Sequence, residues 1–182
     1  MENTPLSHTA LHDVSLVINE GEFTAIAGET GAGKSTLMQL IGGLIQPTSG
    51  IVSVDGVPLG KRTPKNDMKD RSARFRVGMV FQYPEHQLFE ETVYEDIAFG
   101  PRNQGLPEAE VERRVQESME LVHLPQVYRE RSPFALSGGE RRRTAIAGVL
   151  ALAPRYLVLD EPAAGLDPRG REELLSMLST LH

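Results

Sequence analysis

The chain has 182 residues, which is enough for one domain with a substantial core but short for two independent domains. Its 40% hydrophobic content argues against intrinsic disorder, and the absence of cysteine excludes disulfides, thiolate metal sites and cysteine nucleophiles. The net charge of −6 argues against nucleic-acid binding through a broadly basic surface.

The first predicted elements are strands. Val14, Leu16 and Ile18 recur at every second position, residues 19–21 form a turn, and residues 23–27 are a second apolar run. This pattern predicts a hairpin or two adjacent strands.

A glycine-rich loop follows the second run. The sequence GETGAGKS fits the phosphate-binding pattern G-x-x-x-x-G-K-S, with a predicted strand before it and a predicted helix after it. Inward-facing amides and the positive end of the helix would bind a polyphosphate, Lys34 would add a full charge, and the Ser35 hydroxyl would hold Mg²⁺. The alternative is a strand-to-helix turn that binds no ligand. The predicted binding residues are Gly28, Glu29, Thr30, Gly31, Ala32, Gly33, Lys34, Ser35 and Thr36.

The helix after this loop is predicted from apolar residues at helical spacing, Leu37, Leu40, Ile41 and Leu44, and ends before the breaker residues 46–50. Residues 51–54 and 77–81 read as short strands, with a tight turn at 55–56 and a surface loop over 61–70.

Gln82 follows the predicted strand 77–81 directly. That position suits a side chain that reaches Mg²⁺ or an attacking water. An exposed glutamine without a role is the competing interpretation.

Helical periodicity dominates residues 85–153. Thr92 and Glu95 have the spacing of a capping box, and Pro107 opens a helix with a single apolar face. That face consists of Val111, Val115, Met119 and Val122.

The sequence LSGGE opens a further helix. Ser137 and Glu140 alone would make a capping box, but Gly138 and Gly139 at the start of a helix cost stability and need another reason. Close approach of a second phosphate group to the backbone is that reason. One nucleotide does not need two such loops from one chain, so these four residues are predicted to bind a nucleotide held by a partner subunit.

Residues 141–143 are the single compact basic run, which we interpret as a solvated helix face.

The longest apolar run, residues 145–153, has about half the ~20 residues needed to cross a bilayer. No apolar signal core follows a charged leader at the N-terminus. Membrane contact is therefore expected to be peripheral.

Residues 156–159 are an apolar strand that delivers two carboxylates at its C-terminal end, where open α/β sheets bind ligands. Asp160 would belong to the magnesium shell, and Glu161 would orient or deprotonate the attacking water. A strand that merely runs into a polar loop is the alternative.

The last predicted helix begins after Asp167 and Pro168 and has Leu174, Met177, Leu178 and Leu181 on one face. Asp167 is interpreted either as a helix cap or as a residue at a dimer interface. The elements together predict an α/β fold interrupted by an α-helical lobe.

These motifs together resemble the ATP-binding-cassette (ABC) ATPases. They are a Walker A loop, a Q-loop glutamine in VFQYPE, the signature LSGGE, a Walker B strand in YLVLDEP and a D-loop in AGLD, in the order of that family. The run FQYPEHQLFEETVYEDIAFGP, with EPAAGLDP and RRRTAIAGVLA, is most similar to the ATPases of energy-coupling-factor transporters.

The resemblance implies a P-loop NTPase fold, with a RecA-like core and an antiparallel β part, interrupted by a helical subdomain. In one ABC ATPase domain over 1–182, the core would comprise 1–84 and 154–182 and the helical subdomain 85–153. The resemblance also implies ATP and Mg²⁺ as cofactors. Ser35, Gln82 and Asp160 would contact the metal, and Gln82 and Glu161 would act in catalysis.

The resemblance also implies partners. A second ABC ATPase subunit, identical or paralogous, would share two ATP molecules with this chain, each bound by one Walker A loop and the other chain's signature. An integral membrane subunit and a substrate-binding membrane subunit would import vitamins, cobalt or nickel. The chain would be peripheral on the cytoplasmic face of the membrane and would not bind nucleic acid. The transported substrate and the choice between homodimer and heterodimer do not follow from the sequence.

Two departures from the family suggest an incomplete chain with an incomplete C-terminal part. The adenine-stacking aromatic residue expected near the start does not occur in residues 1–5, and His182 lies in the last helix rather than after a strand. A nucleotide-binding fragment with little turnover is therefore one alternative. A soluble, non-transport ABC ATPase is another, although neither a coiled-coil insertion nor a strongly basic face is present.

Overall fold

A parallel strand pair lies at the centre of the molecule in the computed structural model, which describes residues 9–59 and 72–181. β3 (Val77–Val80) pairs with β4 (Tyr156–Leu159), and Val77 lies opposite Tyr156 while Val80 lies opposite Leu159. β1 (Ser53–Val54) and β2 (Val57–Pro58) form a separate antiparallel hairpin. The mixed α/β architecture predicted from the sequence is confirmed.

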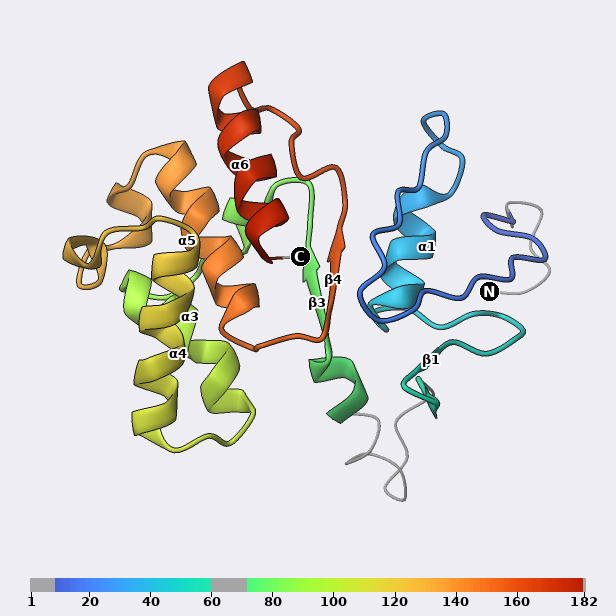
Figure 1. The fold of residues 1–182 in the computed structure, drawn as a ribbon, viewed down its shortest axis with the longest axis horizontal. Coiled ribbons are helices and arrows are strands. Elements are labelled where there is room, and N and C mark those ends of the chain that lie inside the picture. The colour runs from blue at the N-terminus through green and yellow to red at the C-terminus, as the bar shows by residue number, and fades with distance from the viewer. Residues whose placement is uncertain (1–8, 60–71, 182) are drawn as a thin grey trace.

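Helices lie on both sides of this sheet (Figure 1). α1 (Lys34–Ile41) lies beside β4, and α3 (Val93–Asn103), α4 (Glu108–Leu121) and α5 (Gly138–Leu150) pack on one another. α6 (Pro168–Leu181) follows β4, and three 3₁₀ turns, η1 (Pro84–Gln87), η2 (Gln126–Tyr128) and η3 (Pro133–Ala135), connect the helices. The helices α3 to α6 lie on the side of this sheet away from the N-terminus, and α1 lies on the side of the N-terminus (Figure 1).

The main core joins these helices to the sheet. Ile97 of α3, Val111 and Val115 of α4 and Ile146 of α5 are buried together with Val80 of β3. Spacing of three or four residues places such side chains on one face of each helix, as the sequence predicts. A smaller cluster, Val54, Leu59, Ala73 and Val77, lies under the hairpin.

The β1–β2 hairpin is confirmed, although it is shorter than residues 51–54 suggest. Asp55 and Gly56 have φ values of 49° and 74° and join Val54 to Val57 in a two-residue turn. Asp-Gly is favoured in such turns because both positions require positive φ. Strand β4 has the predicted bounds, and β3 ends one residue earlier than predicted.

The predicted strands over residues 14–18 and 23–27 are wrong, because neither run forms a strand in the structure. The turn between them does form, since the Glu22 amide donates to the Asn19 carbonyl at 3.1 Å. Leu16, Val17 and Phe23 remain 47%, 77% and 71% exposed. A strand needs a neighbouring backbone for its hydrogen bonds, and here a cavity separates both runs from β4.

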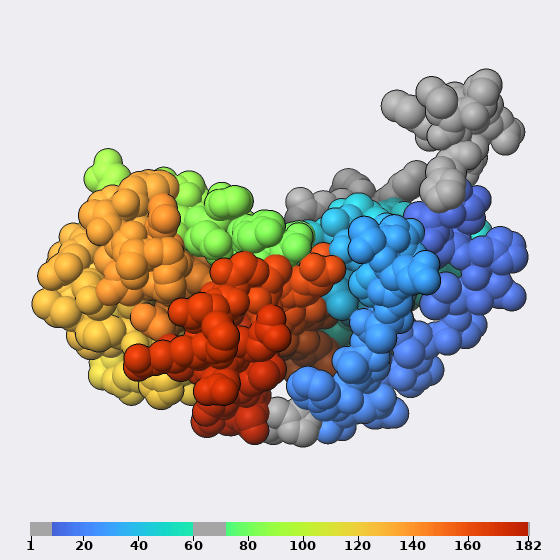
Figure 2. All heavy atoms as spheres, turned by 90° about the horizontal axis from the view of Figure 1, so that it is seen from above, coloured from blue at the N-terminus to red at the C-terminus, as the bar shows by residue number. Residues whose placement is uncertain are grey.

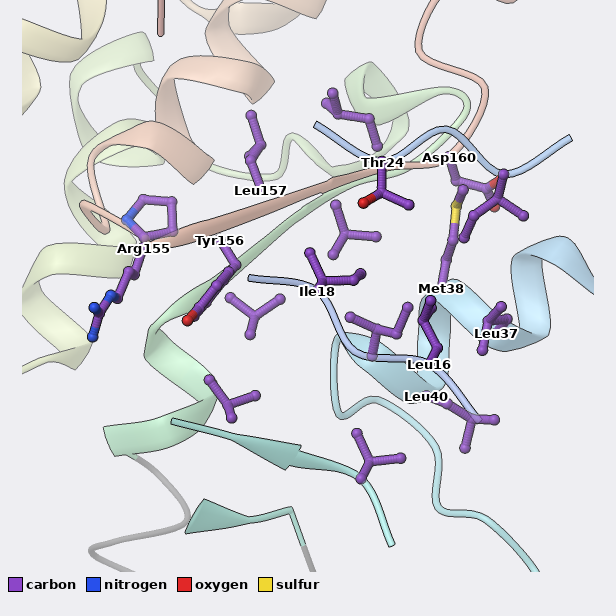
Figure 3. Close-up of a pocket in the computed structure, with 18 of the residues that line it drawn as sticks. Leu16, Ile18, Thr24, Leu37, Met38, Leu40, Arg155, Tyr156, Leu157 and Asp160 are labelled. Carbon is purple, nitrogen blue, oxygen red and sulfur yellow. The ribbon is translucent and has the colours of Figure 1, made fainter. Parts of the chain in front are cut away.

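That cavity, of about 2170 Å³, lies between the N-terminal segment, α1 and β4. Leu16 and Ile18 point into it from one side, and Met38 of α1 points into it from another (Figure 3). Within the described residues, β4 therefore pairs with a strand along one edge only. In the space-filling view the N-terminal segment (blue) and the helices α4 and α5 (yellow to orange) lie at opposite ends of the molecule, with α6 (red) between them (Figure 2).

The predicted helix ends are confirmed with two corrections. α1 ends at Ile41, so the prediction that this helix continues to Leu44 is wrong. The Gly170 amide donates to the Asp167 carboxylate at 2.7 Å, so Asp167 caps α6. The Thr92 hydroxyl accepts from the Glu95 amide at 3.2 Å, but the Glu95 carboxylate pairs with Arg102 and so does not complete the predicted capping box. The predicted loop over 61–70, the expectations for residues 1–5 and that for His182 lie outside the described residues.

Gly78 in β3 has no room for a side chain, since an added Cβ would lie 2.8 Å from Pro154 and from Val149. We predict that Gly78→Ala destabilises the fold by about 1–3 kcal/mol through overpacking. Urea unfolding would measure this change. Gly148→Ala in α5 is the matched control, because its Cβ would meet nothing closer than 3.8 Å. Equal effects of the two substitutions would contradict the packing argument.

Candidate functional site

The glycine-rich loop leads directly into α1, and two of its glycines are required by its backbone. Gly31 and Gly33 have φ values of 85° and 87°, which other residues rarely adopt. A Cβ on Gly33 would also lie 2.6 Å from the carbonyl oxygen of Ala10. The backbone conformation of the loop therefore explains why the motif has glycine at Gly31 and Gly33.

The start of α1 has the properties of an anion site. Its N-cap, Gly33, offers no side chain to the first helical amides, and the first turn has no acidic residue. Free amides and the helix dipole at such an end favour a negatively charged ligand. Ser35 is exposed and Thr36 is half-buried in this turn, and Glu29, Thr30 and Ala32 are exposed in the loop.

The Lys34 side chain folds back over the loop. Its Nζ donates to the carbonyl oxygens of Gly28 and Glu29, both at 2.8 Å. An ammonium group has three N–H donors, so these two bonds leave one donor for a ligand. These two bonds hold the lysine ammonium over the loop.

The two strands deliver polar residues to the same edge of the sheet. The Asp160 amide donates to the Val80 carbonyl at 2.9 Å, which extends the pairing by one residue. One step further, Gln82 Nε2 donates to Glu161 Oε2 at 3.0 Å. Glu161 is exposed and adopts a left-handed φ of 47°. Backbone strain of this kind often occurs at functional sites.

Asp160 and the loop lysine face one space. Asp160 is 9% exposed and lines the same cavity as Lys34 and Thr36. It is seen at one end of this cavity, with Thr24, in Figure 3. Two residues of the predicted phosphate site, Lys34 and Thr36, thus line the same cavity as the strand-end carboxylate, whereas residues 28–33 and Ser35 are not among its lining residues.

The segment LSGGE starts α5 and does not join this cavity. Its capping box is formed, with the Glu140 amide donating to the Ser137 hydroxyl and the Glu140 carboxylate accepting from the Ser137 amide at 2.8 Å. Gly138 and Gly139 are exposed, have no positive φ and would meet nothing within 4 Å of an added Cβ. Packing within the described chain therefore does not explain these glycines.

Hydrogen bonds from Ser137 and Tyr128 lower the pKa of the Glu140 carboxyl to about 2. The carboxylate thus stays ionised at the first turn of α5, where the helix dipole also favours negative charge. In this structure the Glu140 carboxylate completes the cap of α5.

Sequence reasoning missed one residue of this region. The interpretation of residues 141–143 as a solvated face is wrong for Arg142, which is 6% exposed. Its spacing of four residues from the buried Ile146 was the available signal, because positions i and i+4 share a helix face. A short run of arginines obscured that periodicity.

The donor groups fit a nucleotide with a hard cation. The loop offers amides and one ammonium N–H for phosphate oxygens, and Ser35, Gln82 and Asp160 offer oxygen ligands of the kind that Mg²⁺ prefers. Groups of three or more His, Cys, Asp or Glu side chains that could hold a metal do not occur in the described part of the chain. Within residues 9–59 and 72–181, no helix is both long and apolar enough to span a membrane.

Comparisons with known proteins agree with this geometry. The profile of the family "ABC transporter" matches residues 11–164. The chain is 59% identical over 175 residues to an energy-coupling factor transporter ATP-binding protein of Symbiobacterium thermophilum, covering 96% of this chain and 59% of that protein. A protein of the same name from Clostridium perfringens is 51% identical, with 100% of this chain and 63% of that protein covered. The chain thus spans about 60% of the length of these relatives.

Solved structures give the same picture. CbiO1 from Clostridium perfringens, described as part of the ABC transporter complex CbiONQ, matches with a TM-score of 0.80 and 41% identity over 94% of this chain and 66% of its own. The ATP-binding cassette MJ0796, in a dimeric post-hydrolysis state bound to ADP and phosphate, matches with a TM-score of 0.79 and 32% identity over 94% and 74%.

The capping box makes the stability of the chain depend on pH. Because the folded pKa of Glu140 lies near 2 and its ordinary value is 4.5, the ionised carboxylate stabilises the fold above pH 4.5, and this contribution is lost as the pH falls towards 2. We predict that Glu140→Gln lowers the urea midpoint at pH 7 and that the difference from wild type shrinks as the pH falls from 4.5 towards 2. Glu172→Gln, which removes an exposed carboxylate of α6, is the control. A difference that does not change with pH would contradict the prediction.

Proposed function

The chain belongs to the ABC transporter family, and on that premise we propose that it is the ATP-binding and ATP-hydrolysing subunit of an energy-coupling-factor importer. The names of the relatives, energy-coupling factor transporter ATP-binding proteins, support the transporter class. The single observation that carries ATP binding is the loop before α1, where Gly31 and Gly33 have positive φ and Lys34 is held over the loop mouth.

The triphosphate would lie on this loop. Its oxygens would accept from the amides between Gly28 and Thr36 and from the Lys34 ammonium, which would exchange carbonyl partners for phosphate. Ser35, Gln82 and Asp160 would hold Mg²⁺, which when bound neutralises charge on the phosphates.

Hydrolysis would use the pair at the strand ends. Gln82 and Glu161, joined by a 3.0 Å hydrogen bond, would orient one water towards the terminal phosphorus, and Glu161 would accept its proton. The oxygen of this water forms the new bond to phosphorus while the bond to the ADP oxygen breaks, which releases ADP and phosphate. The exposure of Glu161 leaves its carboxylate accessible to that water.

The signature segment would serve a second ATPase subunit, identical or paralogous. Ser137, Gly138, Gly139 and Glu140 start a helix outside the cavity of the glycine-rich loop, and Gly138 and Gly139 leave the backbone open to approach. A pair of subunits would therefore hold ATP between the loop of one and the signature of the other. The dimeric state of MJ0796 supports this arrangement.

The proposed importer would also include two membrane subunits, one that transmits movement and one that binds a vitamin or a transition-metal ion. The chain would be peripheral on the cytoplasmic face of the membrane. Net charge of −6 supports partners other than nucleic acid.

A nucleotide-binding role without turnover is the second candidate. The cavity between the N-terminal segment and β4 favours it, because within residues 9–59 and 72–181 no strand precedes the loop to fix it relative to Asp160. Both candidates require ATP to bind.

We predict that the chain binds ATP with Mg²⁺ and that Lys34→Ala weakens binding at least about tenfold, because charge-assisted bonds to phosphate are lost. Calorimetry with ATP and Mg²⁺ would measure the affinity. Lys34→Arg keeps the charge, and Glu172→Gln, at an exposed position of α6 outside the cavity, tests for non-specific effects. Failure of the wild-type chain to bind millimolar ATP would refute the proposal.

We predict that Glu161→Gln leaves ATP affinity near wild type but lowers the hydrolysis rate by about 10²–10⁴-fold, the usual contribution of a positioned base. Phosphate release under saturating ATP and Mg²⁺ would measure the rate. Glu172→Gln is again the matched control. A wild-type chain that binds ATP but releases no phosphate would favour the second candidate, and an active Glu161→Gln chain would remove Glu161 from the chemistry.

A further inference from the structure

Arg142 of α5 is a buried cation that contacts two distant segments of the chain. Its Nη1 donates to the carbonyl of Ala164 at 3.0 Å. Its Nη2 donates to the carbonyl of Gln82 at 3.3 Å and to that of Pro162. A single planar guanidinium thus joins the signature helix to the segments after β3 and after β4.

The three carbonyls belong to the backbone that carries the catalytic candidates. Gln82 supplies one itself, and Pro162 directly follows Glu161. The Ala164 amide donates to the Glu161 carbonyl at 2.9 Å, so the third carbonyl lies in the tight turn that begins at Glu161. Arg142 therefore binds the main chain of Gln82 directly and, through Pro162 and Ala164, the turn that begins at Glu161.

Stability alone is a poor reason for this arrangement. Arg142 is 6% exposed, its partners are neutral carbonyls, and its Nε has no hydrogen-bond partner. Burial of a cation without a carboxylate costs free energy that carbonyls offset only in part, and an apolar side chain at this position would avoid the cost. The guanidinium does, however, hold α5 at a fixed distance from Gln82 and from the turn at residues 162–164.

We propose that Arg142 is a positioning residue that sets Gln82 against Glu161 and ties both to the helix that starts with the signature. The catalytic part of this inference rests on the proposed function, whereas the positioning part does not. Because Ser137 begins the same helix, a ligand contact at the signature is linked through α5 and Arg142 to this chain's own Gln82 and Glu161.

Arg114 of α4 provides a matched control for Arg142. It is also partly buried, and its Nη1 donates to the carbonyls of Ala151 and Leu152 at 3.3 and 3.1 Å. Its contacts lie in the helical part of the molecule and involve neither Gln82 nor Glu161. Replacement of either arginine by methionine removes the charge and keeps most of the side-chain length.

Hydrogen exchange tests the positioning without nucleotide or turnover. In Arg142→Met, the amides of residues 80–83, 160–161 and 163–165 are expected to exchange about tenfold faster, because bonds from a charged donor have been lost. Arg142→Lys is expected to restore part of the protection, and Arg114→Met is expected to leave both segments unchanged. Unchanged exchange at both segments in a folded Arg142→Met chain, or equal acceleration in Arg114→Met, would overturn the proposal.

Kinetics test the consequence. Arg142→Met is expected to lower kcat about 10- to 100-fold, as for a misplaced catalytic group, while ATP affinity stays within about threefold of wild type. In the double variant with Glu161→Gln the loss is expected to vanish, because Arg142 acts through that carboxylate. Additive losses would overturn the proposal. If the wild-type chain hydrolyses no ATP, the proposed function fails, and the exchange measurement still decides the role of Arg142.

Discussion

The parallel hydrogen bonding of β3 with β4 is the interaction on which the rest of the site depends. Its register places Val80 opposite Leu159, and the bond from the Asp160 amide to the Val80 carbonyl continues it past the strand ends. Gln82 and Glu161 are each two residues beyond that pair, so they meet at the same sheet edge. A slip of one residue would turn these side chains to opposite faces. The backbone ladder, rather than the polar side chains, therefore brings the carboxylates and the glutamine together.

Features with local causes could be predicted from the sequence. β4, the Asp-Gly hairpin, the cap at Asp167 and the glycine-rich loop each depend on residues within a few positions of one another. Features that depend on residues far apart in the sequence could not be predicted from it. Residues 14–18 and 23–27 have strand-like patterns, but a strand also requires a partner backbone, and the cavity occupies the place where one would lie. Arg142 was missed because its partners are 60 and 20 or more residues away.

The two glycine-rich segments differ in what requires the glycines. At Gly31 and Gly33 the backbone conformation does so, and at Gly33 the neighbouring main chain also excludes a side chain. At Gly138 and Gly139 neither constraint applies, and the space in front of them is open. The conformation of the loop around Gly31 and Gly33 is therefore set within the chain, whereas Gly138 and Gly139 expose their backbone at the surface. This asymmetry is what a pair of subunits that exchange contacts would need, and Arg142 connects the helix that starts at the outward segment to Gln82 and to the turn after Glu161.

The half-paired state of β4 has a consequence for the behaviour of the chain in concentrated solution. The edge of β4 that has no strand partner among the described residues lies beside apolar side chains, and such an edge offers a template on which another chain can extend the sheet, the usual first step of ordered aggregation. Mutual repulsion from the net charge of −6 opposes this encounter and weakens as salt shortens the Debye length. Low ionic strength and dilute stocks are accordingly the conditions that keep this chain colloidally stable.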